Sequence, residues 1–434
     1  MSFKKLEYDF RNPPGEFRLV PFWFWNHEIE DEELIWQIDE MKKKGMGGFF
    51  IHARHGLLTP YMSEKWLEKV EHAVKRAKQL DMKAWLYDED NWPSGAVGGR
   101  VIRENPEYRM SGIYPSCEFR ARGPSKFEKE LKTDDGLICV LAIPRNGSEL
   151  SGVPQKVRDI THCVKENKLY WNVPPGDWLV MVMARHILRE FGFWDGQYVD
   201  TLNPKAISRF IKLTHEVYAQ RLQKYIDSVI PGIFTDEPSA DYVMMFVKNA
   251  IPWTDKLEER FKSKYGYKLR EYLPALFYNI GPDTSRIRCD FYRTVTSLYQ
   301  EAFLGQIYNY CNKNKLLSIG HVHGEGELYF HMRQQGDFFE ATKSMHYAGL
   351  DHLFEETWPP EKRQFTNNLV GAKFASSAGH LLEKPRVLSE AFGCASGWRL
   401  SLRTLKWLAD WQIAMGINFF AHHEFYYYIQ GFRK

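Results

Sequence analysis

The sequence lacks the features that mark membrane, exported and nucleic-acid-binding proteins. No apolar run approaches the ~20 residues needed to cross a bilayer. No apolar stretch follows the first basic residues, so we expect neither a membrane partner nor a secretory signal. An excess of one charge is also missing, since 58 Lys and Arg stand against 55 Asp and Glu, a formal net charge of +3. Such a balance does not favour nucleic acid as a partner.

Cysteine is scarce and scattered. The six cysteines lie at positions 117, 139, 163, 289, 311 and 394, and no two of them form a CxxC pair. This spacing fits neither a zinc cage nor a disulfide framework. We therefore predict a reduced, cytoplasmic protein.

Aromatic residues, in contrast, are abundant. The chain of 434 residues contains 14 Trp, 23 Tyr and 29 Phe, which is 15% of its residues. Most of these must lie in the core, but flat apolar faces are also what sugar-binding clefts use. The hydrophobic share of 44% and charged share of 26% are ordinary for a globular protein and argue against disorder.

Short apolar strands alternate with amphipathic helices along most of the chain. We predict eight strands, at residues 18–25, 48–52, 83–87, 233–235, 316–322, 350–354, 386–389 and 417–421. Eight such units favour a (β/α)8 TIM barrel of the α/β class, and no Gly-rich phosphate loop follows the first strand to indicate a dinucleotide-binding sheet.

The alternation breaks between the third and fourth predicted strands. Residues 112–200 carry turn signals and β patterning, which predicts an inserted β subdomain. The predicted organisation is therefore a first barrel part at residues 1–111, the insertion at 112–200, and a second barrel part at 201–434.

In a barrel of this kind the active site lies at the carboxyl ends of the strands. Glu237 and Glu390 closely follow the fourth and seventh predicted strands. Two carboxyl groups facing each other across a barrel mouth are what glycosidic cleavage needs, one to protonate the leaving oxygen and one to attack or to activate water. We predict Glu237 as general acid and Glu390 as nucleophile or base. The alternative is that either residue caps a helix or pairs with an arginine.

Other polar and aromatic residues stand at the predicted strand ends, where we expect them to bind substrate. They are Trp25, His52, Arg54, Asp88, Asp90, Trp92, Asp236, His321, His323, Glu325 and Glu424. The acidic run from Asp88 to Asp90 could bind hydroxyls, hold Ca²⁺ through oxygens, or form a solvated loop. Trp25 and Trp92 could stack on a sugar or pack in the core. We assign no residue as a metal ligand.

Two other function classes remain open. His321 and His323 would point the same way on a strand, because side chains alternate, and such a pair could hold zinc in a metal-dependent amide or ester hydrolase. A non-catalytic carbohydrate-binding barrel is the third reading.

Several motifs together resemble a known family. PFWFWN, GGFFIHARHG, LYDEDNWPSG, GIFTDEPS, KPRVLSEAFGCASGW and DWQIAMGINFFAHHEFYY occur in this order. They are similar to the α-L-rhamnosidases of glycoside hydrolase family 106. The resemblance implies a barrel whose catalytic carboxylates map onto Glu237 and Glu390, a glycoside or oligosaccharide substrate, an inverting course and the use of calcium. The residues themselves predict no cofactor.

The resemblance also bears on the end of the chain, because similar proteins usually continue into C-terminal β-sandwich domains. The sequence ends soon after the eighth predicted strand, and its run of residues 425–429 is aromatic and apolar. We expect this run to be an exposed patch that a second copy, in a homo-oligomer, or a further C-terminal domain covers.

Overall fold

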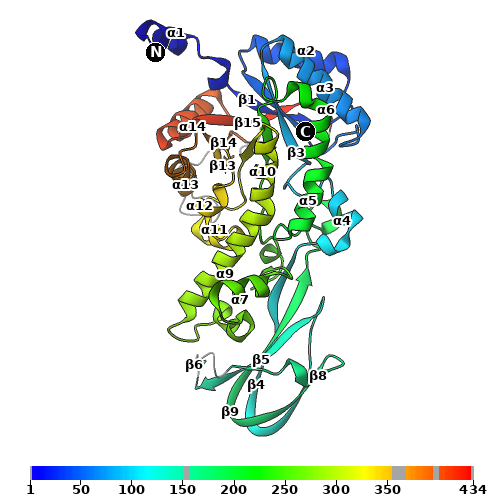
Figure 1. Cartoon of the computed structure of the whole chain (residues 1–434), viewed down its shortest axis with the longest axis vertical. Helices are drawn as coiled ribbons and strands as arrows, with labels where there is room; N and C mark the ends of the chain where they lie inside the picture. The colour runs from blue at the N-terminus through cyan, green and yellow to red at the C-terminus, as the bar shows by residue number, and fades with distance from the viewer. Residues whose placement is uncertain (1, 148, 151–156, 354–367, 394–399, 432–434) are drawn as a thin grey trace.

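The computed structural model describes residues 2–147, 149–150, 157–353, 368–393 and 400–431 (Figure 1). Its centre is an eight-stranded sheet with the strand order β12-β10-β3-β2-β1-β15-β14-β13. All the neighbouring strands in this order are parallel. The strands are β1 (Val20–Trp25), β2 (Gly48–Ala53), β3 (Lys83–Asp90), β10 (Gly232–Thr235), β12 (Leu317–Gly320), β13 (Ala348–His352), β14 (Val387–Ala391) and β15 (Phe419–Tyr426). The predicted (β/α)8 barrel is confirmed.

The barrel closes where its two edge strands, β12 and β13, approach each other. A Cβ atom on Gly349 would lie 1.9 Å from the carbonyl oxygen of Gly320. Gly320 itself has φ +132°, and a Cβ there would lie 1.8 Å from the carbonyl oxygen of Thr235. Gly349 thus lets the edge strands β12 and β13 approach each other, and Gly320 lets β12 lie close to β10.

The strands are buried on both faces, which is why they are almost continuously apolar in sequence. In β1 the side chains alternate: Phe22 and Phe24 belong to the core inside the barrel, whereas Trp23 and Trp25 belong to the core between strands and helices. The inner core also draws on the other strands, through Phe50, Trp85, Tyr87, Phe234, Ile319, Leu388 and Phe419. This packed interior leaves the carboxyl ends of the strands as the place for a site.

Helices cover the outside of the barrel and begin at the predicted capping residues. The Ser63 hydroxyl accepts the N–H of Trp66 at the start of α3, and the Asn203 side chain accepts the N–H of Lys205 at the start of α5. The helices are α1 (Phe3–Arg11), α2 (Asp31–Lys43), α3 (Glu64–Gln79), α4 (Arg100–Glu104), α5 (Pro204–Leu213), α6 (His215–Leu222), α7 (Leu257–Tyr265), α8 (Pro274–Phe277), α9 (Thr284–Tyr299), α10 (Gly305–Lys313), α11 (Leu328–Gln334), α12 (Phe338–Thr342), α13 (Asn368–Leu381) and α14 (Leu402–Met415). Within the described part of the chain, none of these helices combines the length and the apolar character that crossing a membrane requires.

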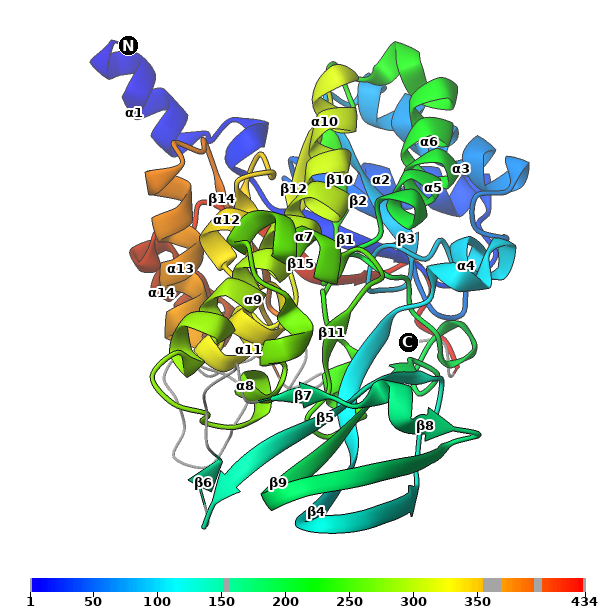
Figure 2. The same ribbon diagram turned by 60° about the horizontal axis from the view of Figure 1, so that its bottom comes forward.

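An antiparallel sheet projects from the barrel between β3 and β10 (Figure 2). Its two long strands, β4 (Ser111–Glu130) and β9 (Lys168–Ile187), pair along their length, and β5 (Leu137–Asn146) pairs with β9. Short strands complete it: β6 (Glu149–Leu150), β7 (Arg158–Asp159), β8 (Val164–Lys165) and β11 (Ile251–Trp253). The sequence did not indicate β11, which comes from the segment after β10 and pairs with β4. The segments that follow β3 and β10 therefore build one wall beside the mouth of the barrel.

The aromatic run near the end of the chain is not the exposed patch that the sequence suggested. Strand β15 continues to Tyr426, and the N–H of Tyr427 then donates to the carbonyl of Phe24 on β1, at 2.8 Å. Tyr427 is 6% exposed, and the side chain of Asn26 exchanges hydrogen bonds with the backbone of Tyr428. The run follows β1 instead of leaving the barrel, so Tyr427 is buried and Phe425, Tyr426 and Tyr428 are half-buried, whereas Ile429 is exposed.

Candidate active site

The carboxyl ends of the strands bring a ring of polar side chains together inside the barrel mouth. The contacts run from His52, whose ring stacks on Tyr87 at 3.6 Å, to Asp236, whose Oδ2 accepts the Tyr87 hydroxyl at 2.5 Å. They continue through His321 to Glu390, and His423 lies 3.9 Å from Glu390. Residues from six strands or their ends thus form one connected group.

His321 is the centre of this group. Its Nε2 lies 2.9 Å from Glu390 Oε2 and 3.2 Å from Asp236 Oδ1, and its Nδ1 lies 3.3 Å from Glu325 Oε1. Burial alone would lower the pKa of His321, but these three carboxylates raise it well above the ordinary value. In turn, burial would raise the pKa of Asp236, and the hydrogen bond from His321 lowers it instead. We therefore describe His321 as an imidazolium and Asp236 as its ionised partner.

The two predicted catalytic glutamates both have raised pKa values. Burial and the charge of Asp236 raise the pKa of Glu237 to about 8 and that of Glu390 to about 8. Each carboxylate also raises the pKa of its neighbours by repulsion, so the two titrate together. The group as a whole therefore keeps a proton at neutral pH.

Their surroundings decide where that proton resides. Glu390 is 5% exposed and receives a hydrogen bond from His321, which favours its ionised form. Glu237 is half-buried as a residue, and its carboxyl group makes no hydrogen bond to the described residues. Its backbone is held at φ +46°, and its carbonyl accepts the Tyr242 hydroxyl. The arrangement favours a protonated Glu237 facing the mouth and an ionised Glu390 beside His321.

Arg54 and aromatic rings form the outer rim beside these acids. The Arg54 guanidinium lies 4.3 Å from the ring centre of Phe24 and 4.0 Å from that of Trp92. The ring of Trp92, which is half-buried, contacts Phe193 from the inserted segment edge to face at 4.9 Å. The positive charge of Arg54 lowers the pKa of Glu237 and of His52, which places it close to both. Arg54 and Trp92 thus lie together at the rim of the mouth, and their expected role in binding substrate stays a prediction.

The acidic run after β3 is not a shared cation site, because its three carboxylates have separate partners. Asp88 is 0% exposed and accepts the hydroxyls of Ser94 at 2.5 Å and Thr235 at 2.7 Å. Glu89 accepts five backbone N–H groups, those of residues 90 and 95–98. Asp90 is half-buried and accepts the side-chain amide of Asn91. Of the three, Asp90 alone remains near solvent.

The position of Asp88 gives it a supporting role instead of the hydroxyl-binding role expected. Ser94 Oγ, which donates to Asp88, also accepts the backbone N–H of Asp236 at 2.8 Å. Asp88 therefore fixes the turn that carries Asp236 and Glu237, and its side chain does not reach the mouth.

Trp25 does not join the other predicted site residues. Its side chain is 0% exposed and packs edge to face against Trp66, 5.0 Å away, and against Trp23, 5.3 Å away. The strand alternation that points Phe24 into the barrel points Trp25 outward, so it packs in the core and cannot stack on a bound sugar in this structure.

The remaining predicted residues lie at or near the group but in different roles. Burial lowers the pKa of His52, and its Nδ1 donates to the Ala53 carbonyl, so its ring is neutral.

His323 lies beyond the end of β12, where its Nδ1 bonds to Gln334 and its ring lies 5.0 Å from Tyr242. It therefore does not pair with His321, as a shared zinc site would require. Glu325 is 4% exposed and faces His321, and Glu424 lies 3.2 Å from His423.

Four residues of the group were missed from the sequence: Tyr87, Tyr242, Asp351 and His423. Tyr87 and Asp351 fell inside predicted strands, where an inward position is not separable from an outward one without the register. A lone aspartate in an otherwise apolar strand was the available signal for Asp351. Tyr242 follows Glu237 by five residues and gave no periodic signal.

Among the described residues, one buried cluster of possible metal ligands can be compared with the calcium that the resemblance implies. The ligand atoms of Asp236, His321 and Glu390 lie within 4.8 Å of one another, close enough in principle to share an ion. Calcium prefers six to eight oxygen ligands, whereas one of these three is an imidazole nitrogen at hydrogen-bond distance from both carboxylates. The set fits a charged imidazole between carboxylates and does not fit calcium.

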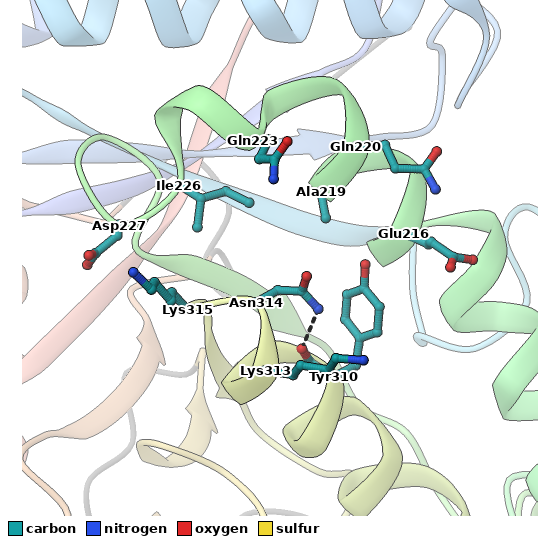
Figure 3. Close-up of a pocket in the computed structure, with 10 residues that line it drawn as sticks. All are labelled: Glu216, Ala219, Gln220, Gln223, Ile226, Asp227, Tyr310, Lys313, Asn314 and Lys315. Carbon is teal, nitrogen blue, oxygen red and sulfur yellow. Dashed lines mark hydrogen bonds between the residues drawn. The ribbon is translucent and has the colours of Figure 1, made fainter.

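A separate pocket of about 630 Å³ lies away from this group (Figure 3). It lies between α6 and α10, beside the segments that lead into β10 and β12, so it belongs to the amino ends of those strands. Its lining is mostly polar and includes Gln220, Gln223, Tyr310 and Asn314. None of the predicted site residues contributes to it.

Comparison with known proteins assigns the chain to a family. Residues 139–428 match the family model described as alpha-L-rhamnosidase, glycoside hydrolase family 106. The chain belongs to glycoside hydrolase family 106. A rhamnosidase from Novosphingobium sp. PP1Y has a similar structure, with a TM-score of 0.70 at 16% identity over 98% of this chain, which supports the family 106 barrel.

A curated relative carries a different description. A putative beta-glucuronidase from Formosa agariphila is 23% identical over an alignment of 473 positions, gaps included, that covers 97% of this family 106 chain. The chain spans 38% of the length of that relative and 56% of the length of the Novosphingobium structure.

Proposed function

We propose that this chain hydrolyses α-L-rhamnosides, with Glu237 as general acid and Glu390 as base or nucleophile. The observation that carries the proposal is the contrast between two neighbouring glutamates, one half-buried without a hydrogen bond and one held by His321. Glycosidic cleavage needs one protonated and one ionised carboxyl group in the same mouth. Membership of family 106 supports the assignment.

In the proposed reaction Glu237 donates its proton to the glycosidic oxygen as the bond to the sugar breaks. Glu390 then either attacks the anomeric carbon or removes a proton from the attacking water. His321 keeps Glu390 ionised through the 2.9 Å hydrogen bond. Arg54 and the ring of Trp92 lie on the rim beside Glu237, where they would contact the leaving group.

Charge favours a neutral sugar over a glucuronide. Among the described residues, five carboxyl groups gather around the mouth together with the two cations His321 and Arg54. The five are Asp236, Glu237, Glu325, Asp351 and Glu390. The carboxylate of a glucuronide would enter this field at a cost in free energy, whereas rhamnose carries no charge.

The proposal is tested by measuring kcat/KM on a set of 4-nitrophenyl glycosides. We expect the α-L-rhamnoside to be cleaved at least tenfold better than the β-D-glucuronide or β-D-glucoside. Faster cleavage of the glucuronide would assign the activity of the Formosa relative instead. Absence of turnover, together with binding of L-rhamnose in calorimetry, would support the non-catalytic reading.

The role of Glu390 is decided by the product formed first. If Glu390 is a base, proton NMR during hydrolysis shows the β-anomer of rhamnose appearing before mutarotation. Early appearance of the α-anomer would instead make Glu390 a nucleophile that forms a covalent intermediate.

A further inference from the structure

Asp351 is an acidic residue at the mouth of the barrel, and it has no role in the proposed reaction. It lies on β13, which pairs with β14 in register so that Asp351 stands directly opposite Glu390. Residues in register on neighbouring strands share a face of the sheet. Since Glu390 reaches His321 inside the barrel, Asp351 also faces the interior, beside the proposed base.

The backbone of Asp351 is fixed, but its carboxyl group lacks a partner. Its N–H donates to Glu325 Oε1 at 2.6 Å, which ties this strand to the His321 group. The Oδ1 atom is buried and makes no hydrogen bond in the described structure, while the side chain as a whole is half-buried and so reaches the mouth. A buried polar oxygen without a partner costs free energy, and a bound ligand is one way to supply the partner.

The surroundings define the chemistry of that partner. Glu390, Glu237 and Glu325 are close enough for their charges to raise the pKa of Asp351 well above the ordinary value, after the larger effect of burial. The nearest cation, His321, already has its two ring nitrogens directed at carboxylates. An anionic group would be repelled here, and a neutral group that both donates and accepts hydrogen bonds fits.

We infer that Asp351 binds a ring hydroxyl of the sugar whose anomeric carbon lies at Glu390. The inference rests on the proposed function, since it takes the sugar bound in this mouth to be rhamnose. It adds a substrate-binding residue from β13, which contributes no other side chain to the proposed reaction. Either protonation state of the carboxyl group can pair with a hydroxyl, because each can accept and the neutral form can also donate.

The test compares the effect of Asp351 on substrates that differ by one hydroxyl. The substrates are 4-nitrophenyl α-L-rhamnoside and its 2-, 3- and 4-deoxy analogues. We expect Asp351→Ala to lower kcat/KM at least tenfold on the parent and on two of the analogues. On the analogue that lacks the bound hydroxyl, we expect the wild type to be weak already and Asp351→Ala to cost less than twofold more. Asp351→Asn should recover part of the loss, because an amide also accepts and donates.

Controls separate this inference from folding and from the proposed function. Asp283→Ala changes an exposed aspartate and should behave as the wild type. Equal losses on all four substrates, or none, would overturn the inference while the proposed function stands. If Asp351→Ala does not fold, judged by its circular dichroism and melting, Asp351→Asn is compared across the four substrates in the same way. A wild type that neither cleaves the parent nor binds L-rhamnose in calorimetry would overturn the proposed function, and the inference with it.

Discussion

Glu237 and Glu390 carry the same functional group but have different neighbours. Burial and the charge of Asp236 raise the pKa of each to about 8, and of the two glutamates it is Glu390 that receives a hydrogen bond from His321. A single side-chain contact therefore separates an acid from a base within one group of carboxylates. At the scale of the residue, the proposed mechanism depends on this difference.

For Glu390 we expect the change to glutamine to abolish hydrolysis without unfolding the chain. Glutamine keeps the size of the side chain but cannot act as base or nucleophile, so kcat should fall by about three orders of magnitude or more. The rate on 4-nitrophenyl α-L-rhamnoside is measured beside Glu107→Gln, an exposed position that should keep full activity. A Glu390→Gln enzyme with wild-type rates would remove this residue from the mechanism.

The change of Glu237 to alanine should affect substrates according to their leaving groups. A general acid matters most when the departing oxygen is basic, so loss should be severe on alkyl or sugar leaving groups and small on 2,4-dinitrophenyl. In the wild type, activity on poor leaving groups should decline as pH rises through about 8, because Glu237 then loses its proton. Equal losses on both kinds of substrate would show that another group is the acid.

Among the elements, β12 and β13 form the seam at which the barrel closes. Gly349 on β13 has no room for a methyl group, because the carbonyl oxygen of Gly320 lies 1.9 Å from where its Cβ would be. Since backbone atoms cannot give way as a flexible side chain does, an added Cβ must push the two strands apart. Two residues of the proposed site lie close to the seam in sequence, since His321 follows Gly320 directly and Asp351 follows Gly349 by two residues.

We expect Gly349→Ala to destabilise the protein by about 2 kcal/mol or more through this clash. The matched control is Gly371→Ala in α13, where the nearest atom lies at 3.5 Å and an ordinary contact results. That control should be neutral or stabilising by roughly 0.5–1 kcal/mol, as for glycine replaced within a helix. Urea unfolding curves of both variants give the comparison. Equal stability of Gly349→Ala and wild type would mean that the edge strands are not in contact.

The elements that the sequence predicted well are those with a local signal. The helix starts at Ser63 and Asn203 follow from capping chemistry, and the eight strands follow from apolar runs between helices. Glu237 and Glu390 could be singled out because they stand near the ends of such runs. The site residues missed or misplaced depend on which face of a strand a side chain occupies, as for Asp351 and Trp25. That choice is set by the register and twist of neighbouring strands, which no local pattern records.

Over the whole molecule, the segments after β3 and β10 carry the largest additions to the barrel. They pair through β4 and β11 and bring Phe193 and Tyr242 to the side where Glu237 lies. The acidic group beside this wall contains more carboxyl groups than cations and is buried. Its burial has a cost in free energy, which lowers the stability of the whole fold.

That cost should make the folded chain less stable as pH rises. The ordinary pKa of a glutamate is 4.5, whereas the folded pKa of Glu237 is about 8, so the folded chain binds a proton that the unfolded chain has released between these values. The contribution of Glu237 to the free energy of unfolding is therefore fully present below pH 4.5 and is lost as pH rises through 8.

Glu237→Gln removes the titration, so the variant should be more stable than the wild type at pH 8, by about 1 kcal/mol or more, and similar to it near pH 4.5. Thermal melts at pH 4.5, 6, 7 and 8, with Glu107→Gln as the exposed control, measure the difference. A gap that does not widen with pH would show that Glu237 is ionised at neutral pH in the folded chain, and would leave the proposed acid without its proton.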